Sequence, residues 1–138
     1  MTIGIRESFD RLRAALDAGE LDPDLEALHV DLMSAFGSVA RRHSDANSEP
    51  ADLDIGVRFD GPVRLLEVVN LLVDTTGYDN IDVAVVTGEH PVLDAEAMGG
   101  IPLYERVSGA FAEAQMAAIG HLWDTAKFRE LDRKLLAR

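Results

Sequence analysis

Residues 29–59 read HVDLMSAFGSVARRHSDANSEPADLDIGVRF and contain two predicted strands separated by a polar loop. In residues 29–36 apolar side chains recur at alternate positions, as they do along a strand with one buried face. In residues 52–59 three aliphatic side chains share one face, while Asp52 and Asp54 share the other. The intervening residues are polar and turn-rich. The sequence therefore predicts that two carboxylates project together from one face of a sheet.

Helical and strand periodicities alternate along the rest of the chain, which predicts an α/β fold. Asp22-Pro23 is typical of a turn, and Pro62 suits the first position of a helix. We expect helices at about 7–18, 63–76 and 91–98. We expect further strands at 80–87 and 101–107. A long final helix, capped by Ser108, is expected at about 108–136. We expect a single domain over residues 1–138, with its core at about 28–107.

The composition favours a folded chain without thiol chemistry. The chain has 138 residues and no cysteine, and 47% of its residues are hydrophobic. The formal net charge of −12 disfavours a general nucleic-acid binder, because such a protein needs a basic surface. Residues 127–138 carry five basic and two acidic groups (+3), and the rest carries eight basic and 23 acidic groups (−15). We expect a cytoplasmic protein with no membrane segment, whose acidity maintains solubility or attracts cations or a basic protein.

Gly37-Ser38 follows the first predicted strand directly and is the first candidate functional element. Glycine lets the backbone approach a ligand closely, and amides at the start of a helical turn can hold phosphate oxygens together with a serine hydroxyl. The alternative is a structural turn, because glycine and serine are common where a strand ends. The dipeptide alone leaves both interpretations open.

The acidic residues of two strands form the second candidate. Asp52 and Asp54 are like charges on one strand face, so they need compensation, and Mg²⁺ prefers oxygen ligands such as these. If the strand at 80–87 lies beside the strand at 52–59, Asp82 joins the pair. Three such carboxylates can hold two metal ions for phosphoryl transfer. The alternative for each carboxylate is a solvated sheet face.

The combination of these elements is more specific than its parts. Gly-Ser followed after 13 residues by Asp-Leu-Asp-Ile resembles the signature of the DNA polymerase β-type nucleotidyltransferases. Over roughly residues 28–130 the chain resembles the minimal nucleotidyltransferases of the MntA type, which are antitoxins paired with HEPN-fold HepT ribonuclease toxins. The segments that carry this resemblance are residues 36–41, 81–86, 90–93, 100–105 and 122–124.

The resemblance implies a nucleotidyltransferase fold, in which a small mixed sheet is flanked by helices and followed by a long C-terminal helix. It implies that Gly37 and Ser38 bind the β- and γ-phosphates of ATP. It also implies a catalytic and metal-binding role for Asp52, Asp54 and Asp82, which would ligate two Mg²⁺ ions. The implied reaction transfers AMP from ATP to a tyrosine of the cognate HEPN toxin.

Arg41 and Arg42 are the remaining nucleotide-binding candidates. Arg41 is either a phosphate contact or a member of a structural ion pair. Arg42 stands where the family usually has glycine, so it either touches the triphosphate or crowds the turn. The loop before the aspartate pair is also longer than is common in the family. Neither departure removes a carboxylate, so we expect catalytic competence.

Two other functions stay open at this stage. A non-catalytic antitoxin would neutralise the toxin by binding alone. A nucleotidyltransferase for a small molecule would need room for a substrate domain, and this chain has little. The expected partners are ATP and a HEPN toxin bound in a complex, with no membrane and no direct nucleic-acid contact.

Overall fold

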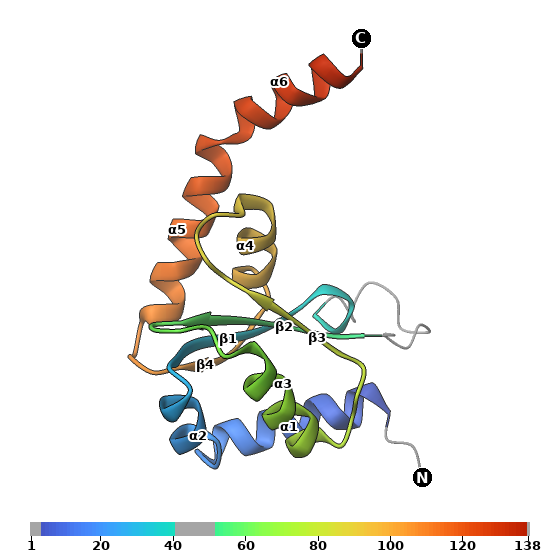
Figure 1. Ribbon diagram of the computed structural model, residues 1–138, viewed down its shortest axis with the longest axis vertical. Coiled ribbons are helices and arrows are strands. Elements are labelled where there is room, and N and C mark those ends of the chain that lie inside the picture. The colour runs from blue at the N-terminus through green and yellow to red at the C-terminus, as the bar shows by residue number, and fades with distance from the viewer. Residues whose placement is uncertain (1–3, 41–51, 138) are drawn as a thin grey trace.

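The computed structural model describes residues 4–40 and 52–137, and its centre is a four-stranded mixed sheet (Figure 1). The strand order is β3-β2-β1-β4. β1 runs antiparallel to both of its neighbours, and β2 runs parallel to β3. The strands are β1 (Val30–Phe36), β2 (Leu53–Phe59), β3 (Ile81–Val85) and β4 (Ile101–Glu105). The predicted α/β class with a small mixed sheet is confirmed.

One face of the sheet is covered by α1 (Ile5–Asp17), α2 (Asp22–Ala27) and α3 (Leu65–Thr76) (Figure 1). The three aliphatic residues of β2 are fully buried there, as the alternation predicted. The prediction of a turn at Asp22-Pro23 was wrong, because proline fits the first turn of a helix and α2 begins there. The prediction for Pro62 was also wrong, since α3 begins only at Leu65.

α4 (Pro91–Met98) and α5 (Ala110–Asp124) cover the other face, over a second buried cluster that includes Leu32 and Met98. A β-bulge lies between Val30 and Leu32, and these two residues of β1 belong to different buried clusters. We expected Val30 to share a face with Leu32, but the bulge turns the strand, so that Val30 packs with Met33 in the first core. β1 is consequently buried on both faces.

The predicted single helix over 108–136 is in fact two helices, α5 and α6 (Ala126–Leu136), which meet at Thr125 (Figure 1). The Thr125 hydroxyl donates to the carbonyl of His121 at 2.9 Å. The Arg129 guanidinium donates to the carbonyl of Leu122 at 2.7 Å. Side chains therefore bind carbonyls that end α5, and the chain changes direction. No residue of α6 between 126 and 136 is buried.

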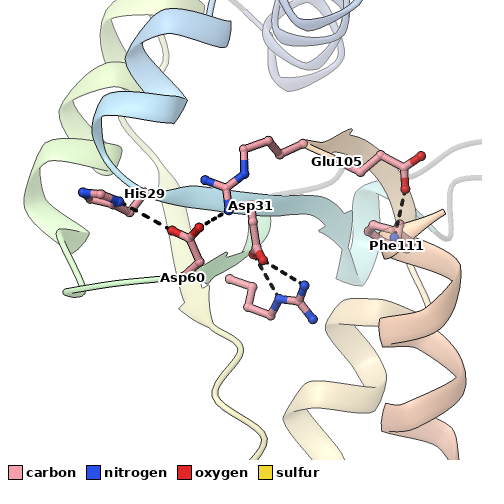
Figure 2. A network of polar contacts seen from close by, with 7 residues as sticks. His29, Asp31, Asp60, Glu105 and Phe111 are labelled. Carbon is pink, nitrogen blue, oxygen red and sulfur yellow. Dashed lines mark hydrogen bonds and ion pairs between the residues drawn. The ribbon is translucent and has the colours of Figure 1, made fainter. Parts of the chain in front are cut away.

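The start of α5 also differs from the prediction, because Ser108 does not cap it. The residue before the helix is Gly109, and the Glu105 carboxylate accepts the backbone N–H groups of Gly109 at 3.1 Å and of Phe111 at 2.9 Å. Figure 2 shows the contact between Glu105 and Phe111. A carboxylate at a helix N-terminus satisfies free amides and complements the helix dipole. The last residue of β4 therefore fixes where α5 begins.

Ion pairs join the strands at the end of the sheet where β1 begins (Figure 2). Arg58 of β2 binds Asp31 through two hydrogen bonds of 3.0 and 2.9 Å. Asp60 pairs with Arg106, and its Oδ1 lies 3.6 Å from Nδ1 of His29. These contacts tie β1, β2 and the residue after β4 together, so they fix the register on which the opposite end of the sheet depends. Among the described helices, none is long and apolar enough to cross a membrane.

Candidate active site

The end of β1 and the starts of β2 and β3 meet at one end of the sheet. Phe36 of β1 pairs with Asp54, and Asp54 in turn lies directly opposite Asp82 of β3. The condition that the strand at 80–87 lies beside the strand at 52–59 is met, because β3 pairs with β2. Cross-strand partners point to the same face and neighbouring strands are about 4.8 Å apart, so the carboxylates of Asp54 and Asp82 are neighbours. Asp54 is half-buried and Asp82 is exposed.

Gly37 turns the chain away from β1 with a φ of +70°, a conformation that side chains with a Cβ rarely adopt. The Asp54 carboxylate occupies the space beside it. A Cβ built on Gly37 would lie 3.2 Å from Cγ of Asp54 and would overlap its Oδ2. The backbone angle therefore favours glycine, and any larger residue would also have to displace the Asp54 carboxylate, so the position of Asp54 is coupled to this turn.

Ser38 lies within a short 3-10 turn, Gly37–Val39. The helical conformation thus starts at Gly37, directly after β1. Val39 is 1% exposed and anchors the turn in the first core, while Ser38 stays half-buried beside Gly37. The turn thus presents its serine at the same end of the sheet as the aspartates. Arg41 and Arg42 lie outside the described residues.

Asp52 is oriented by a residue that the sequence analysis did not select. The Asn80 side-chain amide donates a hydrogen bond of 2.7 Å to Oδ1 of Asp52. The Asn80 carbonyl also accepts the backbone N–H of Leu53 at 3.2 Å. Asn80 thus holds the start of β2 through its backbone and its side chain. A polar residue placed directly before the Asp82 strand is the signal that could have identified it.

α4 packs over this end of the sheet, against β1 and β2. Gly56 permits its close approach, because a Cβ there would lie 2.8 Å from Cβ of Ala97 and 2.7 Å from Oγ of Ser34. The space enclosed is a cavity of about 430 Å³, lined by Phe36, Gly37, Ala40, Asp54, Ala95, Glu96, Gly99 and Gly100. Its volume lies within the range of small-molecule sites. Gly37 and Asp54 therefore share the border of a ligand-sized cavity.

The donor atoms suit Mg²⁺, since the site offers carboxylate oxygens from two neighbouring strands. Within residues 4–40 and 52–137, however, no three acidic or histidine side chains lie close enough together to form a metal-binding group. The register thus brings two carboxylates side by side and Asp52 near them, and the three side chains are not drawn together around one point.

Solved structures share this arrangement of strands and helices. An MntA–HepT toxin–antitoxin structure matches with a TM-score of 0.61 and 14% identity, over 91% of this chain and 98% of that chain. A toxin–antitoxin structure with AMP-PNP gives a TM-score of 0.61 and 15% identity, over 86% of this chain and 97% of that one. This chain has the fold of the MntA antitoxins.

A third structure with the MntA fold is that of a tri-AMPylated Shewanella oneidensis HEPN toxin in complex with an MNT antitoxin. Its TM-score is 0.60 at 12% identity, over 90% of this chain and 98% of that one. No protein-family model matches the sequence, and neither does a curated protein sequence. At these identities the MntA likeness establishes the fold, while the chemistry has to be argued from this chain's own residues.

Proposed function

We propose that this protein is a Mg²⁺-dependent nucleotidyltransferase that transfers AMP from ATP to a tyrosine of a HEPN toxin and thereby acts as its antitoxin. The observation that carries the proposal is the register of three strands. The Gly37 turn, Asp54 and Asp82 lie at one end of the sheet, where Gly37 and Asp54 border a cavity of about 430 Å³. The same fold occurs in an antitoxin complex with an AMPylated HEPN toxin and in a structure with AMP-PNP, which supports this choice of reaction.

Each residue of the site has a proposed task. The backbone of the turn at Gly37 and the hydroxyl of Ser38 bind the β- and γ-phosphates, with Arg41 and Arg42 as further contacts to the triphosphate. Asp52, Asp54 and Asp82 would hold two Mg²⁺ ions, which would supply positive charge against the phosphates and make the attacking hydroxyl more acidic. Asn80 keeps Asp52 in position through its 2.7 Å hydrogen bond.

The reaction itself is an in-line substitution. The tyrosine oxygen of the toxin bonds to the α-phosphorus of ATP, the bond from that phosphorus to the bridging oxygen breaks, and pyrophosphate leaves. Asp82 is exposed, so it is accessible to a hydroxyl that a partner protein brings, and it accepts or orients the hydroxyl proton. The AMP group then remains on the toxin as a bulky anion, which blocks RNA cleavage.

The test is AMP transfer in vitro with α-labelled ATP, Mg²⁺ and the HEPN toxin with which this chain is proposed to pair. Asp54→Asn and Asp82→Asn are each expected to lower the transfer rate by on the order of 100-fold, because each removes charge that the transition state needs. Asp74→Asn is the matched control, since Asp74 is an exposed carboxylate of α3 on the opposite face of the sheet. Equal rates for all three variants would refute the assignment.

A second candidate, a non-catalytic antitoxin, is favoured by one observation. Arg42, in the segment that follows Gly37-Ser38, stands where the minimal nucleotidyltransferases usually have glycine. Under this alternative the acidic body neutralises a basic ribonuclease by contact alone. An Asp52→Ala/Asp54→Ala variant that still rescues cells from the toxin, without labelling it, would decide for this candidate. Loss of both rescue and labelling in a folded variant would decide for transfer.

A further inference from the structure

A second cavity, of about 470 Å³, lies on the other side of α4 from the candidate active site. It is bounded by α4, α5 and the ends of β2 and β3. Most of its lining is apolar, and the polar side chains at it include Arg58, Asp94 and His121. The proposed transfer reaction uses none of these residues. The volume lies within the range of small-molecule sites.

Asp94 is the unusual member of this lining, because it is 2% exposed and is the one buried carboxylate among the described residues. Its Oδ2 accepts the backbone N–H of His90 at 3.3 Å, at the start of α4. Its Oδ1 has no hydrogen-bond partner in the described part of the chain. A buried acceptor without a donor is costly in free energy, so native proteins satisfy most such atoms with a protein donor, a water molecule or a ligand.

Arg58, a basic residue of this lining, already forms an ion pair with another carboxylate. Arg58 forms its two hydrogen bonds, of 3.0 and 2.9 Å, with Asp31. No ion pair in the described residues joins Asp94 to His121 or to another basic group. Asp94 therefore lies in the cavity lining, beside apolar side chains, with no counter-ion among the described residues.

We propose that this cavity binds a small organic cation. An ammonium or amidinium group of the ligand donates an N–H to Oδ1 of Asp94, and the apolar body of the ligand packs against Val86, Met98 and Ala118. A divalent metal ion fits less well, because one carboxylate among apolar side chains cannot supply its six or more oxygen ligands. An anionic ligand would face the Asp94 carboxylate with like charge. The ligand is thus defined by one cationic donor group and an apolar remainder.

The test is an NMR titration of the full chain with benzylamine, in the absence of nucleotide and toxin, with benzyl alcohol as a neutral compound of the same shape. Saturable shifts are expected for residues 85–88, 94–98 and 117–121. Benzyl alcohol is expected to bind at least about tenfold more weakly, because it cannot make a charge-assisted hydrogen bond. Equal affinity for both compounds, or shifts centred on Asp54, would overturn the proposal.

Two variants locate the interaction. Asp94→Asn keeps an oxygen for the N–H of His90 but removes the charge, so it should bind benzylamine at least about tenfold more weakly and no better than benzyl alcohol. Asp124→Asn removes an exposed charge outside the lining and should bind as the wild type does. Unchanged affinity in Asp94→Asn would overturn the proposal.

Ala117→Phe keeps the test decisive if Asp94→Asn fails to fold. Ala117 is an exposed residue of α5 that lines the cavity, so a larger side chain can fill the space without disturbing the core. Binding of benzylamine should be lost although Asp94 is intact, and retention of full affinity would refute the site. AMP transfer is not measured in any of these titrations, so their outcome is independent of the proposed function.

Discussion

Gly37→Ala is the substitution that most directly tests how the turn and the carboxylate depend on each other. The new Cβ would meet two obstacles. The backbone φ of +70° is unfavourable for alanine, and the added carbon would lie 3.2 Å from Cγ of Asp54 and overlap Oδ2. Either the turn or the carboxylate has to move.

The two obstacles have separate magnitudes. A left-handed conformation costs a residue with a Cβ about 1–2 kcal/mol. Displacing the half-buried Asp54 carboxylate from its rotamer costs a further ~0.5–1.5 kcal/mol. For a chain of this length each 1 kcal/mol lowers Tm by roughly 3–6 °C. A displacement of Asp54 by about 1 Å would also lower the transfer rate by on the order of 100-fold, because reacting groups need close alignment.

Gly109→Ala is the matched control, because its φ is +90° and a Cβ there would meet no atom within 4 Å. Thermal unfolding followed by circular dichroism should show a loss of about 1–2 kcal/mol for Gly109→Ala and a larger one for Gly37→Ala. Calorimetric titration with Mg²⁺ and AMP-PNP should show weaker binding for Gly37→Ala alone. If the two variants lose equal stability and both bind nucleotide as the wild type does, the coupling between Gly37 and Asp54 is wrong.

Three further predictions concern other contacts. Asn80→Ala should lower AMP transfer roughly tenfold with little change in Tm, since it removes a hydrogen bond to a charged group near the surface; a rate equal to that of the wild type would count against a positioning role. Glu105→Ala should lower the free energy of unfolding by about 1 kcal/mol in urea titrations, because two amides at the start of α5 lose their acceptor; an unchanged midpoint would contradict the capping role. Burial first, and nearby carboxylates second, raise the pKa of Tyr104 above its usual value of 10.0. The folded state therefore holds this proton more tightly than the unfolded state, so the stability due to it is present below about pH 10 and is lost as pH rises through the raised pKa. Tyr104→Phe should lose less stability than the wild type between pH 8 and pH 11 in thermal melts, and parallel losses would exclude the residue.

The strands and their faces could be predicted from sequence because burial is periodic. In β2 every second residue is aliphatic and fully buried, so the alternation identified both the strand and the side from which Asp54 projects. The pairing of Asp54 with Asp82 was expected only on condition that β3 lies beside β2, and the register confirmed that condition. The tasks of these residues in a reaction stay predictions.

The features that the sequence did not predict depend on contacts between distant segments. Asn80 binds Asp52 across 28 positions of the chain, and no local periodicity records such a contact. The bulge beside Asp31 depends on how β1 pairs with β2. The end of α5 at Thr125 depends on a hydroxyl and a guanidinium that bind carbonyls. The apolar residues at helical spacing, which include Ala118, Leu122 and Ala126, continue past that point.

The junction at Thr125 also separates the part of the chain that unfolds as one cooperative unit from α6, which can unfold by itself. α6 buries no side chain between residues 126 and 136, so the free energy that holds the sheet and its helices together does not extend to it. A helix of 11 residues is close to the length at which helices in water are only marginally stable. Amide hydrogens beyond Thr125 should therefore exchange with solvent through local fraying, while those of β1 and β2 exchange only when the whole sheet opens.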